Sequence, residues 1–247
     1  MNSQKDFVFG IQSVMETIKA GTEIDKILMQ LDLQKSSKFP EIHQLAKERQ
    51  IPISRVPLAK LNQITRKNHQ GLIAFISSVR FVSLDNIIRG VFEEGKNPLI
   101  LILDRVTDVR NFGAICRTAE CAGVHAIVIP TKGAAQLGND AMKTSSGALN
   151  FIPVCREVNL AETVQYLQES GIQVIACTEK TDDTLYENDF NQPCAIIMGS
   201  EENGISNDLI RKADRLAKIP IQGQIESLNV SVAAGVILYE VLRQRKI

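Results

Sequence analysis

The sequence predicts an α/β protein with a small N-terminal α/β unit and a C-terminal α/β unit whose sheet is mostly parallel. Two observations support this prediction. Short apolar strands alternate with helical patterns along the chain, and some strands are continuous apolar runs, such as Leu-Ile-Leu-Ile-Leu at 99–103. Runs of this kind are typical of strands that helices cover on both faces. A chain of 247 residues can hold one large domain or two small ones.

The N-terminal unit is predicted to span residues 1–78 and to contain three helices and three strands. Gly21 and three prolines punctuate its pattern, which fixes the approximate ends of the elements. Residues 79–97 are predicted to form a linker with a short helix and a turn. In chain order, the predicted elements are helix Ile11–Ala20, strand Lys26–Gln30, helix Phe39–Arg49, strand Ile53–Val56, helix Lys60–Ile64 and strand Leu72–Ser77.

The C-terminal unit is predicted to span residues 98–247, with strands and helices in alternation. Its first turn, residues 104–113, holds one glycine, so it lacks the Gly-x-Gly-x-x-Gly of dinucleotide-binding dehydrogenases. The predicted strands are Leu99–Leu103, Ala126–Ile129, Ile152–Cys155, Gln173–Cys177, Ala195–Met198 and Ala217–Ile219. The predicted helices are Gly113–Ala122, Ala161–Glu169, Ser206–Ala213 and Asn229–Arg243.

The composition predicts a cytoplasmic protein without a bound metal. No apolar run reaches the ~18 residues of a membrane span, and the N-terminus lacks the plan of a secretion signal. The cysteines are odd in number, lie mostly in apolar segments and form no Cys-x-x-Cys pair, which indicates reduced side chains that fill the core. They are Cys116, Cys121, Cys155, Cys177 and Cys194.

Charge is distributed unevenly, although the net charge is zero. Residues 1–80 carry twelve Lys and Arg against seven Asp and Glu, a balance of +5, and the remainder carries sixteen against twenty-one, or −5. A local basic surface can dock a phosphate backbone whatever the charge of the whole chain. A solvated surface segment is the alternative interpretation. The basic residues with little opposing acid are Arg49, Arg55, Lys60, Arg66 and Lys67.

Three polar, glycine-containing segments each follow a predicted strand. They are 111–119, 198–206 and 219–235, and the last leaves an apolar strand, crosses a loop and enters a helix through Ser-Leu-Asn. Ligands of doubly wound sheets bind at the carboxyl ends of the strands, so the positions of the segments favour one site. Such loops also present unpaired backbone N–H groups.

Each of these polar residues also has a structural explanation when it is taken alone. Asn111, Ser227 and Asn229 suit helix N-caps, and Glu201 beside Glu202 could be helix-start charges. Arg117 lies among apolar neighbours in its predicted helix, so a buried guanidinium there would need a carboxylate or a phosphate. Gly235, in a nearly all-apolar helix, suggests close helix packing, which we expect against another subunit.

Taken in order, the three segments resemble the signature of the SpoU-type (SPOUT) RNA ribose methyltransferases. The opening phrase Phe9-Gly-Ile-Gln-Ser-Val-Met-Glu-Thr-Ile and the later phrase Asn68-His-Gln-Gly-Leu-Ile-Ala are similar to those of the substrate-binding domain that precedes the catalytic domain in some members. The resemblance therefore covers nearly the whole chain. One departure is Val109, where members commonly have proline.

The resemblance implies a trefoil-knotted C-terminal domain, S-adenosylmethionine as the cofactor, and a homodimer whose interface completes the site. The whole combination is most similar to bacterial enzymes that methylate the ribose 2′-OH of a guanosine in 23S ribosomal RNA. Carried over by position, the catalytic residues would be Asn111, Arg117, Glu201, Ser227 and Asn229. The cofactor-binding residues would be Met198, Gly199, Ile219, Leu228 and Asn229.

The implied chemistry needs no metal, because a methyl sulfonium is already activated. Arg117 would bind the phosphate beside the target ribose, and the other polar residues would orient the hydroxyl and the cofactor loop. Residues 1–77 would deliver specificity for 23S rRNA, without a membrane or DNA as partner. Only 5% of residues are aromatic, which argues against an extended base-stacking platform.

Three alternatives stay open on the sequence. Two share the chemistry: a transfer RNA 2′-O-methyltransferase, and a ribosome-methylating antibiotic-resistance enzyme. The third belongs to another class, a catalytically silent RNA-binding protein that keeps the fold. The intact set of polar residues, from Asn111 to Asn229, counts against the silent protein.

Overall fold

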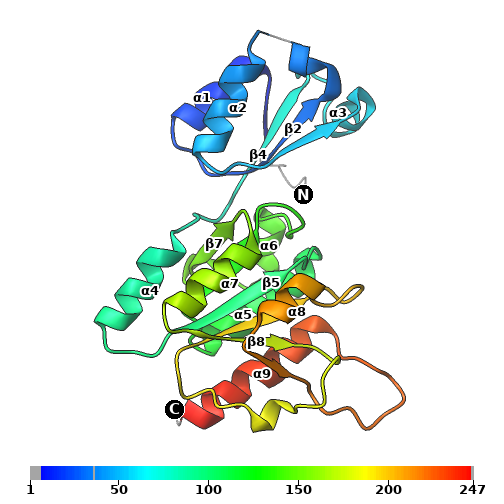
Figure 1. Cartoon of the computed structure of the whole chain (residues 1–247). Helices are drawn as coiled ribbons and strands as arrows, with labels where there is room; N and C mark the ends of the chain where they lie inside the picture. The colour runs from blue at the N-terminus through cyan, green and yellow to red at the C-terminus, as the bar shows by residue number, and fades with distance from the viewer. Residues whose placement is uncertain (1–6, 36, 246–247) are drawn as a thin grey trace. The chain divides into compact units, whose positions relative to one another are not determined.

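The computed structural model describes residues 7–35 and 37–245, which fall into two compact units (Figure 1). The first unit runs to Arg80 and also includes Leu137–Asn139. The second unit holds the rest of the chain from Phe81. The segment predicted as a linker carries helix α4 (Leu84–Glu93), whose Leu84 and Ile88 are buried in the core of the second unit.

The first unit is a four-stranded mixed sheet with helices on both faces (Figure 1). The strand order is β1-β4-β2-β3, and only β2 and β3 run parallel. Helices α1 and α2 bury their apolar sides on one face, and α3 packs on the other through Leu61. The elements are β1 (Phe7–Phe9), α1 (Ile11–Lys19), β2 (Ile24–Gln30), the 3₁₀ turn η1 (Leu31–Lys35), α2 (Phe39–Glu48), β3 (Ile53–Val56), α3 (Leu58–Ile64) and β4 (Leu72–Ile76).

The two sequence motifs that carry the N-terminal resemblance, which begin at Phe9 and at Asn68, are joined by hydrogen bonds in this unit. His69 is buried, and its Nδ1 accepts a hydrogen bond from the Gly71 N–H at 3.0 Å. Its Nε2 therefore carries the proton and donates to Asn62 Oδ1 at 3.0 Å. The Gln70 side chain accepts from the Ile11 N–H at 3.0 Å, where α1 begins. The later phrase thus fixes the turn before β4 and the start of α1.

The second unit is built on a six-stranded sheet in which every strand pair of the described residues is parallel. The prediction of a mostly parallel sheet is confirmed. The strand order is β10-β8-β9-β5-β6-β7, so the first strand of the unit, β5, lies inside the sheet. The strands are β5 (Leu99–Asp104), β6 (Ala126–Pro130), β7 (Val154–Glu157), β8 (Gln173–Cys177), β9 (Cys194–Gly199) and β10 (Arg215–Ala217).

Helices cover both faces of this sheet, as the apolar strands require. Helices α4, α7 and α8 pack on the face that holds Ile100, Val128 and Ile197. Helices α5 and α9 contact each other, and α9 also contacts β9. Besides α4, the helical elements are α5 (Val109–Cys121), α6 (Asn139–Thr144), α7 (Leu160–Glu169), α8 (Asn207–Lys212), α9 (Val230–Arg245) and the 3₁₀ turns η2 (Ala148–Asn150) and η3 (Leu185–Glu187).

Several element ends differ from the prediction for local reasons. Helix α5 begins at Val109, not at Gly113, because Asp108 is its N-cap and Asp108 Oδ1 accepts from the Asn111 N–H at 2.8 Å. The interpretation of Asn111 as the cap is therefore wrong. Strand β10 ends at Ala217, two residues earlier than predicted. Helix α6 and strand β1 were not predicted, because six and three residues are too few for a periodic signal.

No helix in the described ranges is long and apolar enough to cross a membrane.

The cysteines only partly match the prediction of core fillers. Cys116, Cys155 and Cys194 are buried, whereas Cys121 is exposed. Burial raises the pKa of the Cys155 thiol to about 12 and that of Cys194 to about 11, so these two thiols stay protonated and unreactive at neutral pH.

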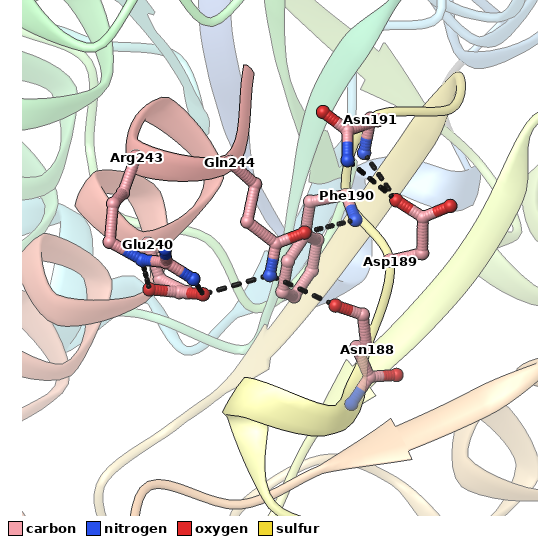
Figure 2. A network of polar contacts seen from close by, with 7 residues as sticks. All are labelled: Asn188, Asp189, Phe190, Asn191, Glu240, Arg243 and Gln244. Carbon is pink, nitrogen blue, oxygen red and sulfur yellow. Dashed lines mark hydrogen bonds and ion pairs between the residues drawn. The ribbon is translucent and has the colours of Figure 1, made fainter. Parts of the chain in front are cut away.

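The far end of α9 is tied to the segment before β9 by a polar network (Figure 2). Gln244 Oε1 accepts from the Phe190 N–H at 2.9 Å, and Gln244 Nε2 donates to the Asn188 carbonyl at 3.0 Å. The same Nε2 donates to Glu240 at 2.8 Å, and Arg243 donates to both oxygens of that carboxylate at 2.7 and 2.8 Å. These bonds fix the end of α9 opposite to its capped N-terminus.

Replacing Gln244 with alanine should lower the free energy of unfolding by about 1–3 kcal/mol, because it removes three hydrogen bonds and leaves a part-buried N–H without its acceptor. The shift of the urea midpoint measures this loss. Gln165→Ala is the matched control, since Gln165 only donates to Glu169 on the exposed face of α7. Equal midpoints for the two variants would contradict the prediction.

Glu240 should make the stability sensitive to acid. Its side chain is 6% exposed, and the hydrogen bonds from Arg243 hold its pKa below the ordinary value of 4.5. A carboxyl whose folded pKa is depressed stabilises the fold fully above its unfolded pKa and loses that contribution as the pH falls through the folded pKa. Glu240→Gln should therefore flatten the fall of stability below about pH 4.5. Unfolding curves between neutral pH and pH 3 would test this, and parallel curves would refute it.

Candidate active site at the carboxyl end of the sheet

The three polar segments meet where β5 and β9 end and α9 begins. Asn229 Nδ2 donates to Asn111 Oδ1 at 3.1 Å and to Glu201 Oε1 at short range. Glu201 Oε1 also accepts from the Val230 N–H at 3.2 Å. Three of the five predicted catalytic side chains therefore form one connected group, although they lie up to 118 residues apart.

Asn229 links the segments and also caps α9. Its Oδ1 accepts from the Ser231 N–H at 2.9 Å, from the Val232 N–H at 3.4 Å and from the Ser231 hydroxyl at 2.5 Å. The oxygen of the amide thus satisfies the helix, and its nitrogen holds the two neighbouring segments. The predicted cap is confirmed for Asn229, whose amide uses only its oxygen for capping, but it is wrong for Ser227, which forms no hydrogen bond with any described residue.

The turn that carries Glu201 depends on Gly199 and Gly204. A Cβ at Gly199 would overlap the backbone of Gly204 and Ile205, so no other residue fits there without a shift of the turn. Gly204 has a φ of +61°, a left-handed conformation that glycine adopts without strain. The Gly204 N–H donates to the Ser200 carbonyl at 2.9 Å and closes the turn. The turn therefore holds its backbone and Glu201 in one place.

A second set of contacts, which the sequence did not predict, holds this turn. Asp104, at the end of β5, is 5% exposed, and its Oδ2 accepts from the Ser206 N–H at 2.7 Å. Arg105 donates to both oxygens of Asp104 at 3.2 Å and to the Gly204 carbonyl at 3.1 Å. The only feature of the sequence that could have indicated this contact is a carboxylate, Asp104, at the end of a buried apolar strand. The pair connects the strand end before Asn111 with the turn that carries Glu201.

Arg117 is exposed on α5, so the expectation that it lies buried among apolar side chains is wrong. Its Nη1 donates to the Ser146 hydroxyl at 3.4 Å, and in the described part of the chain it has no carboxylate partner. Ser146 has a φ of +51°. No hydrogen bond joins Arg117 directly to the Asn111–Glu201–Asn229 group, although Asn111 and Arg117 share a helix. The guanidinium is thus available for an external anion.

Helix α5 is held against the α6 segment at its start. A Cβ at Gly113 would overlap the Thr144 side chain, and Thr144 Oγ1 donates to the Val109 carbonyl at 3.1 Å. The departure from the family pattern at Val109 therefore does not loosen the helix start, because Asp108 and Thr144 both fix it.

The loop after β10 is held at its two ends. The Lys218 N–H donates to the Asp183 carbonyl at 2.9 Å, the Lys218 carbonyl accepts from Leu185 at 2.8 Å, and Asn229 holds the other end. Within the described residues, nothing in 219–228 forms a hydrogen bond, and Ser227 is included in this range. Ile225 is 76% exposed and Leu228 39% exposed. The loop therefore offers free backbone donors and apolar side chains to a ligand or partner.

The other predicted cofactor residues flank this loop and the preceding turn. Met198 is buried at the end of β9, with Gly199 directly after it. Ile219 is half-buried at the start of the loop. The described residues contain no cluster of three or more His, Cys, Asp or Glu side chains that could hold a metal.

Gly235 was expected to pack against another subunit. In the structure it faces Thr118 on α5 of the same chain. A Cβ at this position would meet only the Thr118 methyl at 3.9 Å, an ordinary contact. Other apolar residues of α9 are exposed. Val232 is 53% exposed and Tyr239 56% exposed, and Val236 lies between them on the helix.

Comparison with known families accounts for this arrangement. Residues 98–239 match the model of the SpoU rRNA methylase family, and residues 7–82 match the model of the RNA 2′-O ribose methyltransferase substrate-binding domain. The chain belongs to the SpoU rRNA methylase family. It is thereby an RNA ribose methyltransferase of the tRNA/rRNA type, and the resemblance stated from the sequence is confirmed.

Relatives of similar length support the assignment. A protein of Bacillus subtilis placed among the TrmH family tRNA/rRNA methyltransferases is 38% identical over 99% of this chain and 98% of its own. A Staphylococcus aureus protein with the same family description is 37% identical over 96% of both chains.

Solved structures of SpoU proteins share the fold. The SpoU methyltransferase AviRb from Streptomyces viridochromogenes, solved with AdoMet, aligns over 97% of this chain and 90% of its own, with a TM-score of 0.62 and 24% identity. The A. aeolicus TrmH/SpoU tRNA modifying enzyme aligns over 67% of this chain and 85% of its own, with a TM-score of 0.56 and 27% identity. The two-domain fold with an all-parallel catalytic sheet is therefore that of SpoU methyltransferases. The threading of the chain into a trefoil knot stays a prediction of the resemblance.

Proposed function

We propose that the protein transfers a methyl group from S-adenosylmethionine to the ribose 2′-OH of a guanosine in 23S ribosomal RNA. The observation that carries the proposal is the hydrogen-bonded group of Asn111, Glu201 and Asn229 at the carboxyl end of the sheet. It unites the three segments that the family resemblance predicts to form one active site. The match of residues 7–82 to a substrate-binding model supports an RNA substrate.

The residues present fit the cofactor. S-adenosylmethionine supplies an activated methyl on a sulfonium. The loop 219–228 offers backbone donors that no described residue uses, together with exposed Ile225 and Leu228, which suits a ligand with both an adenine ring and polar groups. Gly199, Ile219 and Leu228 would contact it through their backbones, between Met198 and the capped start of α9.

The chain's own residues would align the ribose hydroxyl and hold its neighbouring phosphate. Arg117 carries a planar guanidinium with paired donors, which suits a phosphate oxygen pair, and Ser146 is its single described partner. Asn111, Glu201 and Asn229 would hold the α5 start and the cofactor loop in register, and Ser227 would contact the hydroxyl or the phosphate. Alignment of two reactants in this way can contribute ~7–11 kcal/mol to lowering a barrier.

We also propose a homodimer that forms through α9 and works in the cytoplasm. Val232 and Tyr239 are each more than half exposed, and such an apolar stripe on a helix suits a second copy of the chain. The buried, protonated thiols are compatible with a reducing compartment. Sedimentation of the purified protein should give the mass of two chains; a monomer at micromolar concentration would refute the dimer.

Methyl transfer to unmodified RNA tests the function. The purified protein is incubated with tritiated S-adenosylmethionine and, separately, with unmodified 23S rRNA, 16S rRNA and tRNA, and the modified nucleoside is then mapped. The expected product is 2′-O-methylguanosine in 23S rRNA. Transfer to tRNA only, or to another nucleoside, would refute the substrate assignment, and no transfer to any RNA would indicate a silent RNA-binding protein.

A further inference from the structure

Three phenylalanine rings lie together on one face of the first unit. The centroid of the Phe7 ring is 6.1 Å from that of Phe75 and 6.2 Å from that of Phe9, with tilted planes. All three side chains are half-buried. They lie on the face that α3 covers, on the edge strand β1 and its inner neighbour β4. We call these three rings the phenylalanine platform.

Strand register explains how the three rings come to share one face of the sheet. Phe7, Phe75 and Lys26 are direct partners across β1, β4 and β2, so they form one row across the sheet. The next row on the same face contains Ile73 and Leu28, which are 0% and 8% exposed and pack with Leu61 of α3. Phe9 is the partner of Ile73 and belongs to this second row, whereas Phe7 and Phe75 stand in the first. All three rings pack against the Leu28, Leu61 and Ile73 cluster.

Two lysine ammonium groups lie over the platform. Lys67 Nζ is 6.0 Å from the centroid of the Phe9 ring, and Lys26 Nζ is 5.4 Å from that of Phe75. Neither lysine forms an ion pair with any residue in the described ranges. Lys60 is exposed on α3, which packs on this face, and exposed Arg66 follows the helix by two residues. An aromatic surface of this kind, rimmed by unpaired cations, is complementary to a base with its phosphates.

Arg49, another of the basic residues predicted from the sequence to form a cluster, does not lie with the lysines over the phenylalanine platform. Arg49 ends α2, which packs on the opposite face, and its guanidinium lies beside Gly21. The basic cluster predicted from the sequence is therefore divided between the two faces, and only its later part accompanies the rings.

We propose that the phenylalanine platform binds an unpaired nucleobase of single-stranded or looped RNA by stacking, while Lys26 and Lys67 move from the rings to the flanking phosphates. The proposal deepens the proposed function and rests on RNA being the substrate. It assigns the recognition of an unpaired nucleotide to this face. It differs from the expectation, drawn from the low aromatic content, that an extended base-stacking platform is absent: composition averages over the chain, whereas strand register gathers three rings in one place.

The test measures binding of the full chain to a short single-stranded oligoadenylate that carries one 2-aminopurine, without cofactor. Stacking should quench the 2-aminopurine fluorescence. Phe75→Leu, which keeps an apolar side chain and removes the ring, should weaken binding by about fivefold to 100-fold. Phe75→Tyr should retain binding. Phe39→Leu is the matched control, because Phe39 is a half-buried ring packed on the opposite face, and it should bind as the wild type does.

Lys67→Gln should lower the slope of log affinity against log salt by about 0.7–1, the contribution of one phosphate contact. A perfectly paired RNA duplex should bind Phe75→Leu and the wild type equally, because its bases are not free to stack.

Several results would overturn the proposal. Unchanged oligoadenylate binding by Phe75→Leu, an equal loss in Phe39→Leu, or no quenching on binding would each do so. A change in the sedimentation of Phe75→Leu with unchanged RNA binding would assign the face to a protein partner instead. The binding assay needs no methyl transfer, so it can be interpreted even if 23S rRNA is not the substrate. A negative binding result likewise does not change the interpretation of the methylation assay.

Discussion

Arg117→Ala should lower the rate of methyl transfer by about 10²–10³-fold and leave the affinity for S-adenosylmethionine unchanged, the loss expected when a positioned donor for transition-state charge is removed. The physical reason is the exposure of Arg117 on α5, where a hydroxyl is its single described partner and no carboxylate neutralises it. Single-turnover rates with saturating cofactor, together with cofactor binding by calorimetry, measure the two effects separately.

Two further variants make the Arg117 test specific. Arg117→Lys keeps the charge and loses the paired donors, so it should recover only part of the rate. Arg211→Ala is a matched control, because Arg211 is an exposed arginine that pairs with Asp208 at 3.5 Å on α8. An undiminished rate in Arg117→Ala with normal cofactor binding would remove Arg117 from the proposed chemistry.

Asn229→Asp should lower methyl transfer by about 100-fold with little change in stability. Aspartate keeps the oxygen that caps α9, but it loses the amide donor to Asn111 and Glu201 and sets two carboxylates against each other. A misplacement of about 1 Å can cost this factor in rate. The group is exposed, so the repulsion should change the free energy of unfolding by less than about 1 kcal/mol.

Asn229→Ala loses the cap as well, so its unfolding free energy should fall by about 1 kcal/mol relative to Asn229→Asp. Asn159→Asp, at the cap of α7, repeats the same chemical change at a helix start outside the group and should keep the wild-type rate. If Asn229→Asp also methylates at the wild-type rate, the link between the three segments has no part in catalysis.

The sheet and the meeting of the three segments could be predicted from the sequence. Buried strands such as β5 are continuous apolar runs, and parallel strands bring the residues that follow them to one edge. Asn111, Glu201 and Asn229 lie in such positions, and the structure joins them. The two family phrases of the first unit likewise meet through Gln70 and Ile11.

The remaining features depend on partners far along the chain, which no local pattern reveals. The contact of Asp104 with the Ser206 N–H spans 102 residues, and the exposure of Arg117 depends on how α5 packs against α9 and η2. The phenylalanine platform arises from the register of β1 and β4, which begin 65 residues apart (72 − 7). Strand β1 itself has three residues and carries no periodicity of its own.

The loop 219–228 has a thermodynamic consequence. Among the described residues, hydrogen bonds hold this ten-residue segment only at Lys218 and Asn229, and fixing the backbone of one residue costs about 1–2 kcal/mol. If binding of either substrate orders the loop, part of the binding free energy of the first substrate offsets this loss of conformational entropy. The second substrate then binds to a loop that is already ordered. We therefore expect cofactor and RNA to bind with positive cooperativity, each raising the affinity for the other by the same factor.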